Sequence, residues 1–365
     1  MDSAPKFKRV TCHRRWMDRV GRAGLASIII PTFNRGELLK ETLDSAVGQT
    51  YRPVEIIVVD DGSTDHTAAL IEQWRGELPG DPGLSVRYIH QENGGVGSAR
   101  NHGLIVSRGE FIQFLDSDDV LHPRKLELQI ACLVKFPESG YAFSEMARIE
   151  DSLQWSEIAV EQARLADSAE FYCSPKVLTM VGVYRRQTCC TAGPWSEDIH
   201  LGEDEEYALR ALLSTEKLVY LPGYLCAFRD HTGPRLTDAQ KHERGWYFAL
   251  QAYDRMAEVA AADGRVNDQR FVEPLVKHLT DIIVMALETG ANVLANTAIR
   301  ICWKLPVKPM RRARLVVYWF LNLMPTGFFL NLWRVWIKFR YYALEIPRRE
   351  FCRIRDGWKL EKRGA

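Results

Sequence analysis

Short apolar runs alternate with amphipathic segments along the first third of the chain. Several runs end at a polar turn, as buried strands do, and they occupy residues 26–30, 54–59, 86–90 and 111–115. The segments between them place apolar side chains at helical spacing, over residues 37–49, 67–77 and 96–107. Strands that alternate with helices are typical of a mainly parallel sheet with helices on both faces. We therefore predict an α/β fold here.

The polar residues that follow these apolar runs are expected to meet at one edge of the sheet. In open sheets of this kind, ligands bind outside the carboxyl ends of the strands. Those ends carry Thr32, Asp61 and Asp116. The pattern therefore predicts one cleft built from three separate parts of the sequence.

The pattern is weaker in the middle of the chain and becomes helical later. Strands are predicted at residues 141–149 and 181–184, on either side of a loop at 151–168 that is a candidate for contacting an acceptor. A helix beginning at Glu203 and an extended segment at 219–228 come next. Few helix breakers occur between residues 246 and 300, which favours a separate helical subdomain.

Charge is distributed unevenly. The net charge of +1 combines +11 over residues 301–365 with −10 over residues 1–300, so the two parts are suited to different neighbours. Within the basic part, the largely apolar segment 316–337 is interrupted by Pro325 and Gly327. Its length permits a membrane span. Two short helices in the membrane interface fit its aromatic residues and basic flanks better. A buried helical hairpin of a soluble domain is the alternative.

The cysteines and the N-terminus bear on the compartment. The 8 cysteines include no Cys-x-x-Cys pair, so a reducing compartment is the simpler interpretation. The basic N-terminus has no continuous apolar segment before Leu25, so we expect no cleaved secretory signal. We predict a cytoplasmic protein that is peripheral on the inner face of the cell membrane.

Acidic clusters at turns carry the candidate chemistry, and they occupy residues 60–65, 116–119 and 203–206. Carboxylates at strand ends can hold a divalent cation and accept a proton, which indicates metal-assisted transfer chemistry. The side chains of Asp116 and Asp118 alternate after a strand and suit one Mg²⁺ or Mn²⁺. A solvated acidic loop is the alternative interpretation.

A nucleotide pocket is predicted near the first two strands. Phe33 can stack on a pyrimidine ring, and the Asp61 carboxylate can accept the imide N–H of uracil. The alternative is an Asp-Gly turn that only caps the next helix. The Gly-rich turn at residues 93–98 enters a helix in which Arg100 can reach a phosphate or fix an acidic loop.

The first turn of the helix beginning at Glu203 is a candidate for the catalytic base. The positive end of the helix dipole is expected to favour ionised Asp204, and an ionised aspartate can accept a proton. The alternative is an acidic first turn that only stabilises the helix.

Taken together, residues 25–235 resemble a family 2 glycosyltransferase of the GT-A fold. The resemblance is carried by motifs in a specific order: Pro31-Thr32-Phe33-Asn34-Arg35, Val58-Val59-Asp60-Asp61-Gly62-Ser63, Asn93-Gly94-Gly95 with Ala99-Arg100-Asn101, Phe114-Leu115-Asp116-Ser117-Asp118-Asp119, and Gly202-Glu203-Asp204. It implies the GT-A, Rossmann-like arrangement of a mainly parallel sheet flanked by helices.

The resemblance also assigns roles to residues. It implies metal binding by Asp118, by Asp116 and, near the end of the domain, by His231, with Asp204 as the base that deprotonates the acceptor hydroxyl during an inverting displacement. The implied nucleotide-binding residues are Pro31, Thr32, Phe33, Asn34, Asp60, Asp61, Asn93, Arg100 and Ser117. Processive synthases of this family carry Gln-x-x-Arg-Trp, and the spacing at residues 240–246 departs from it, which favours single-sugar addition.

We therefore predict a metal-dependent hexosyltransferase that moves a sugar from a nucleotide diphosphate, with UDP expected, to a hydroxyl acceptor. The basic tail favours a lipid-linked glycan or another surface-polysaccharide precursor as acceptor, and no nucleic-acid partner is expected. The predicted parts are a basic extension at 1–24, the glycosyltransferase domain at 25–240, a helical subdomain at 241–305 and a membrane-associating tail at 306–365. A nucleotidyltransferase on a related fold and a non-catalytic sugar-nucleotide-binding membrane module remain the alternatives.

Overall fold

The computed structural model describes residues 20–149, 159–167, 179–215, 217–229, 243–262 and 269–306. The predicted interfacial segment at 316–337 and His231 lie outside these residues. So does most of the predicted N-terminal extension.

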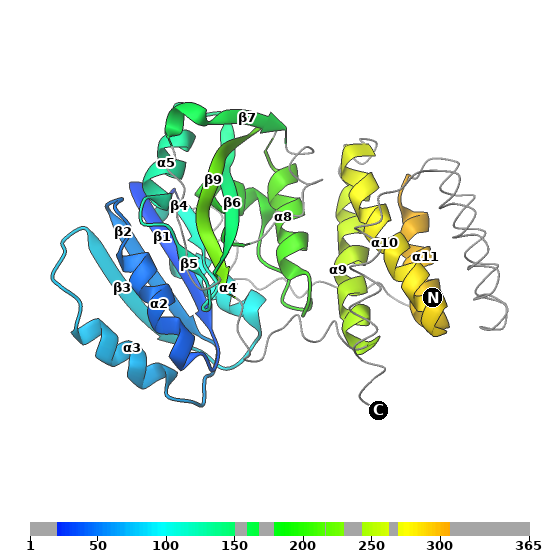
Figure 1. Ribbon diagram of the computed structural model, residues 1–365, viewed down its shortest axis with the longest axis horizontal. Coiled ribbons are helices and arrows are strands. Elements are labelled where there is room, and N and C mark those ends of the chain that lie inside the picture. The colour runs from blue at the N-terminus through cyan, green and yellow to red at the C-terminus, as the bar shows by residue number, and fades with distance from the viewer. Residues whose placement is uncertain are drawn as a thin grey trace. The chain divides into compact units, whose positions relative to one another are not determined.

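The first half of the sheet is parallel and confirms the predicted alternation of strands and helices (Figure 1). Its elements are β1 (Arg22–Thr32), α2 (Gly36–Val47), β2 (Val54–Asp60), α3 (Thr67–Gly76), β3 (Leu84–His90), α4 (Val96–Val106) and β4 (Gly109–Phe114). The spatial order is β3-β2-β1-β4. All of β2 is buried, as expected for a strand covered on both faces. In register, Thr32 pairs with Asp60 and Asp60 with His90, so three strands end at the same level.

The second half of the sheet is mixed. Its elements are β5 (Val120–Leu121), α5 (Lys125–Lys135), β6 (Ser139–Ile149), the 3-10 turn η1 (Val160–Gln162), β7 (Arg164–Asp167), β8 (Gly182–Arg185), α7 (Arg186–Ala192), α8 (Glu203–Leu213) and β9 (Lys217–Arg229). The order continues from β4 as β8-β6-β9-β5, and β7 pairs with β9. The pair β6·β9 is parallel, whereas β8 runs antiparallel to both β4 and β6.

Close packing fixes α4 against the sheet. Gly103 lies where α4 crosses β1, and a Cβ atom there would collide with the side chain of Ile29. Gly97, at the start of the same helix, faces the Ser196 carbonyl, and a Cβ atom would lie 2.7 Å from that oxygen. Small residues therefore let α4 approach both β1 and the segment before α8.

Helices come after the sheet in the sequence, as predicted. They are α9 (Glu243–Ala262), α10 (Gln269–Thr289) and α11 (Asn292–Lys304). The described residues up to Leu279, together with 301–306, belong to one compact unit, and residues 280–300 belong to a second. The division therefore falls inside α10, and the boundary at 240–241 stays a prediction. None of the helices in the described ranges has the length and apolar character needed to cross a membrane.

Candidate active site

The carboxyl ends of the four parallel strands bring the predicted motifs to one edge of the sheet. Phe33 follows β1, Asp61 follows β2, the Gly-rich turn follows β3 and Asp116 follows β4. Pro31 and Thr32 are buried, whereas Phe33 is 47% exposed and open to a stacking partner. Residues of the four loops at this edge of the sheet are therefore the ones expected to line the predicted cleft.

Asp61 organises the Gly-rich turn. Its Oδ1 accepts hydrogen bonds from the Gly94 N–H at 2.9 Å and the Gln91 side-chain amide at 2.7 Å, and its Oδ2 accepts one from the Gly95 N–H at 2.8 Å. Gly95 has φ of +87°, a conformation that favours glycine. Asn93 donates to the Asp61 carbonyl at 2.9 Å. A carboxylate has about four lone-pair sites, so Asp61 keeps acceptor capacity for a base.

Asp60 links the turn at residues 60–65 to β3. Its side chain is fully buried and accepts hydrogen bonds from the Ser63 N–H at 2.8 Å and the Tyr88 hydroxyl at 2.6 Å, with His90 at 3.4 Å. Burial alone would raise the pKa of Asp60, but these hydrogen bonds outweigh it and lower the pKa. Its contact with a nucleotide stays a prediction.

Asn34 joins the loops after β1 and β2. Its N–H donates to the Ser63 hydroxyl at 2.9 Å, and its side-chain oxygen accepts from the Thr64 N–H at 2.9 Å. Asn34 has φ of +51°, in the left-handed region that asparagine tolerates. The residue therefore holds the two loops together, and its binding of a nucleotide stays a prediction.

The Asp116–Asp119 turn concentrates carboxylates after β4. The side chains of Asp116 and Asp118 are 35% and 21% exposed, whereas Ser117 and Asp119 are buried. Burial, and then the charges of Asp116 and Asp118, raise the pKa of Asp119 well above its usual range. Arg229 supports the turn, because its N–H donates to Asp119 at 3.2 Å and its Nε to the Asp118 carbonyl at 3.3 Å.

The donor chemistry of this turn fits a divalent cation bound together with a diphosphate. Asp116 and Asp118 present hard, partly exposed oxygen ligands, and Mg²⁺ is usually held by one or two carboxylates plus substrate phosphates. Within the described ranges, no group of three His, Cys, Asp or Glu side chains is arranged to hold a metal by itself. His231, the third predicted ligand, lies outside those ranges.

Arg100 joins the Asp116 turn to the start of α8. Its Nη2 donates to Asp116 Oδ1 at 2.8 Å and its Nη1 to Glu203 Oε1 at 3.0 Å. Of the two roles predicted for this guanidinium, the structure shows the second, in which it fixes an acidic loop. Burial alone would lower the pKa of Arg100, but Asp116 and Glu203 raise it overall. Two acidic motifs that are distant in sequence therefore bind the same guanidinium group.

Asp204 lies next to that contact, in the first turn of α8. Gly202, with φ of +80°, caps the N-terminus of the helix. Burial, followed by the charges of Glu203 and Glu205, raises the pKa of Asp204 to about 8, although Arg100 opposes the shift. The prediction that the helix dipole would favour the ionised form is therefore wrong in its net direction, because desolvation and neighbouring acids outweigh the dipole. A raised pKa suits a general base.

One residue of the site, Trp195, gave no signal in the sequence. The indole ring of Trp195 lies between the Arg100 guanidinium, at 4.3 Å, and the Tyr207 ring, at 3.9 Å. Asn101 binds the Trp195 backbone in both directions, at 2.9 and 2.7 Å. No spacing pattern links Trp195 to Arg100, so only the folded structure reveals this residue, whereas Asn101 belongs to the motif Ala99-Arg100-Asn101.

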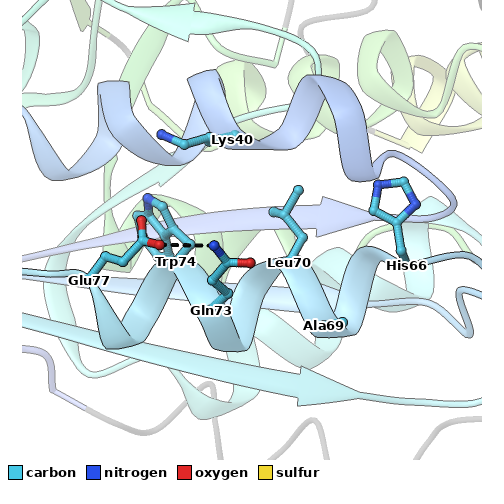
Figure 2. Close-up of a pocket in the computed structure, with 7 residues that line it drawn as sticks. All are labelled: Lys40, His66, Ala69, Leu70, Gln73, Trp74 and Glu77. Atoms are coloured by element: carbon cyan, nitrogen blue, oxygen red, sulfur yellow. Dashed lines mark hydrogen bonds between the residues drawn. The ribbon is translucent and has the colours of Figure 1, made fainter.

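A separate surface pocket lies between α2 and α3 and contains none of the predicted site residues. Figure 2 shows the side chains of Lys40, Leu70, Trp74 and Glu77 around it, and its volume is about 370 Å³. The Trp74 indole N–H is already bound to Asp44 at 2.8 Å. We place the candidate active site at the strand ends, where the acidic motifs meet, and not in this pocket.

Comparison with known proteins agrees with this arrangement. Residues 27–185 match the family model described as glycosyl transferase family 2. An uncharacterised glycosyltransferase of Rickettsia typhi is 42% identical over 111 residues, which cover 30% of this chain and 32% of that protein. Glycosyltransferase GlyA of Streptococcus pneumoniae is 28% identical over 297 residues, covering 74% of this chain and 39% of GlyA. The chain thus spans well under two thirds of the length of these relatives.

Solved structures share the fold. The crystal structure of residues 1–349 of Staphylococcus aureus TarS in complex with UDP superposes with a TM-score of 0.64 at 20% identity, covering 88% of this chain and 94% of that one. The same TarS fragment in complex with UDP-GlcNAc gives a TM-score of 0.61 at 19% identity, covering 77% and 81%. Residues 27–185 therefore resemble glycosyl transferase family 2, and the chain shares the fold of these structures, in agreement with the predicted GT-A fold.

Proposed function

We propose that the chain is an inverting glycosyltransferase that moves one sugar from a UDP-sugar to a hydroxyl acceptor. The observation that carries the proposal is the shared contact of Arg100 with Asp116 and Glu203, at 2.8 and 3.0 Å. This contact brings the predicted metal-binding turn beside the helix that begins with the predicted base. A nucleotide-binding module without catalysis would not need the second of these motifs.

The donor site of the proposal uses the loops after β1 and β2. Exposed Phe33 would stack on the base, and Asp61, held in place by the Gly-rich turn, would accept the uracil imide N–H. UDP is the expected nucleotide, and the UDP and UDP-GlcNAc complexes of TarS support that choice. UDP-GlcNAc is accordingly the first donor to test.

The proposed displacement needs negative charge to be offset on the donor and a proton to be removed from the acceptor. Asp116 and Asp118 would hold Mn²⁺ or Mg²⁺, which would offset charge on the departing UDP. Asp204 would take the proton of the acceptor hydroxyl while the oxygen of that hydroxyl forms a bond to the anomeric carbon. The bond from that carbon to the diphosphate oxygen breaks on the opposite face, so the configuration inverts.

The acceptor we propose is a lipid-linked glycan or another surface-polysaccharide precursor at the cytoplasmic face of the membrane. The support comes from the sequence, in which residues 301–365 carry a charge of +11 and aromatic side chains suited to an anionic interface.

A donor screen tests the proposal. Purified full-length protein with Mn²⁺ is mixed with a panel of UDP- and GDP-sugars and a lipid extract, and nucleotide release and sugar incorporation into lipid are measured. We expect one UDP-sugar to be consumed, with incorporation that depends on the extract. If UDP binds but no donor is consumed with any extract, the non-catalytic binding module replaces this proposal.

A further inference from the structure

The environment of Arg100 differs from that of a phosphate-binding arginine. The residue is 2% exposed, and both terminal nitrogens donate to carboxylates, Nη2 to Asp116 and Nη1 to Glu203. Nη2 also lies 3.4 Å from the Thr179 hydroxyl. The third nitrogen, Nε, is buried and has no hydrogen-bond partner among the residues that the structure describes. A guanidinium enclosed in this way presents almost no surface to a diphosphate.

Aromatic stacking continues the contact from Arg100 into α8. The guanidinium lies 4.3 Å from the centroid of the Trp195 ring, a cation–π arrangement. The Trp195 ring stacks on Tyr207 at 3.9 Å with an interplanar angle of 3°. Tyr207 lies one helical turn after Glu203, so Arg100 contacts the first turn of α8 directly and the second through Trp195.

The neighbouring residue of α4 reinforces this link. Asn101 donates to the Trp195 carbonyl at 2.9 Å and accepts from the Trp195 N–H at 2.7 Å, which fixes that peptide in both directions. It also donates to Glu197 at 2.8 Å. Two consecutive residues of α4 thus hold the segment before α8 and the start of α8 itself.

We propose that Arg100 is a positioning residue for sugar transfer, which sets the first turn of α8, and with it Asp204, relative to the Asp116 turn. This inference rests on the proposed function and deepens it. Arg100 acts through Glu203 and Asp116 and does not contact the donor phosphates. Lysine cannot replace it, because an ammonium lacks the planar fork that reaches two carboxylates and stacks on an indole.

Arg100→Lys tests the proposal in the full-length protein, with Arg186→Lys as the matched control. Arg186 is also a buried arginine, 4% exposed, but it binds Ser107 and Gly109 where β4 begins. We expect Arg100→Lys to lower kcat about 100-fold while donor KM stays within about threefold, the pattern of a lost transition-state arrangement. Arg186→Lys should leave both parameters near the wild-type values.

Equilibrium binding provides a readout that does not depend on turnover. Titration calorimetry with UDP in the presence of Mn²⁺ should give Arg100→Lys a Kd within about threefold of the wild-type value. A phosphate ligand would show the opposite pattern, with the Kd for UDP and donor KM raised about tenfold or more and kcat retained. That result would overturn the proposal.

Glu203→Gln keeps the test decisive if Arg100→Lys does not fold. This variant removes the charge of one carboxylate partner of Arg100, while glutamine keeps the shape of the glutamate side chain. We expect it to lower kcat and to leave UDP binding unchanged. If Arg100→Lys does fold, the double variant adds a further test, in which the loss in kcat should be much smaller than the product of the single losses, because both substitutions act through one contact. Independent, multiplying effects would contradict the proposal. An inactive wild-type protein would instead refute the proposed function. The UDP titration does not depend on activity, so it still tests whether Arg100 contacts the diphosphate.

Discussion

At the residue scale, the site consists of carboxylates that the fold treats in different ways. Asp60 and Asp61 each accept at least two hydrogen bonds, whereas Asp119 and Asp204 each accept one from a backbone N–H, and burial and neighbouring acids raise their pKa. The first two serve as scaffolding in the described structure. Asp204 retains a high pKa, and this difference separates a scaffold carboxylate from a base.

Asp204→Asn tests the electrostatic cost of this arrangement. The pKa of Asp204 is about 8 in the folded protein and about 4 in the unfolded chain. Between these pH values the folded state holds a proton that the unfolded state has released, so the free energy of unfolding falls as pH rises from about 4 to 8. We expect the variant to melt a few degrees higher than wild type at pH 9 and equally at pH 4, measured by thermal unfolding. A variant less stable at pH 9 would contradict the cause given for the pKa.

Asp61→Asn tests the bracing of the Gly-rich turn. The amide nitrogen of asparagine would face the N–H group of Gly94 or Gly95 and cannot accept its hydrogen bond. The substitution therefore removes charge-assisted hydrogen bonds worth about 1.5–3 kcal/mol each. We expect a lower free energy of unfolding in urea and an affinity for UDP weakened about tenfold. Tight UDP binding by a correctly folded variant would show that the uracil ring of UDP does not bind this carboxylate.

At the element scale, the sequence predicted elements whose periodicity is clean and missed those whose buried face is polar. The apolar runs at 26–30 and 54–59 lie within β1 and β2. By contrast, α5 was not predicted, because Lys125 and Gln129 lie on its buried face and interrupt the apolar stripe. The antiparallel insertion of β8 between β4 and β6 depends on contacts between distant residues, so no local pattern could indicate it.

Lys125→Met in α5 tests the cost of this buried polar face. The ammonium is fully buried, and burial lowers the pKa of Lys125 to about 8, so charging it costs stability below that pH. Stability should therefore rise with pH between about 8 and 10.5 in the wild type and not in the variant. We expect Lys125→Met to be more stable at pH 7 by about 1–2 kcal/mol in urea unfolding, after the loss of the Gln129 contact. Lower stability at pH 7 would mean that the Gln129 hydrogen bond outweighs desolvation.

The candidate site shows the same limit of prediction. Asp61 and Asp116 could be placed at one edge, because the carboxyl ends of parallel strands meet there. The partner of Arg100 could not be chosen from the sequence, since Glu203 follows β8 and α7, elements whose arrangement the pattern does not determine. Trp195 gave no signal at all for the same reason.

At the scale of the whole molecule, residues beyond the sheet support the helix that carries Asp204. Helix α9 packs on α8, and Arg255 of α9 forms an ion pair with Asp198 at 3.2 Å, just before α8. A bond of 2.5 Å from Lys304 to Asp254 ties residues 301–306 to the same helix. The compact unit that contains the site therefore extends beyond the sheet.

Truncation near Lys308 tests the proposed membrane contact. The removed residues carry most of the basic charge of the C-terminal part, whose attraction to an anionic leaflet is about 1 kcal/mol per Lys or Arg. We expect the truncated protein to move from the membrane fraction to the soluble fraction while still binding UDP. An unchanged membrane fraction would remove the anchoring proposal.

The most direct test of the proposed mechanism compares wild type with Asp204→Asn in sugar transfer and in UDP binding. With the best UDP-sugar and Mn²⁺, wild-type kcat/KM should rise with pH up to about 8, because the base must be ionised. Asp204→Asn should bind UDP as wild type does and lose at least about 100-fold in transfer at every pH. Transfer by Asp204→Asn at the wild-type rate would contradict the central claim that this residue is the base.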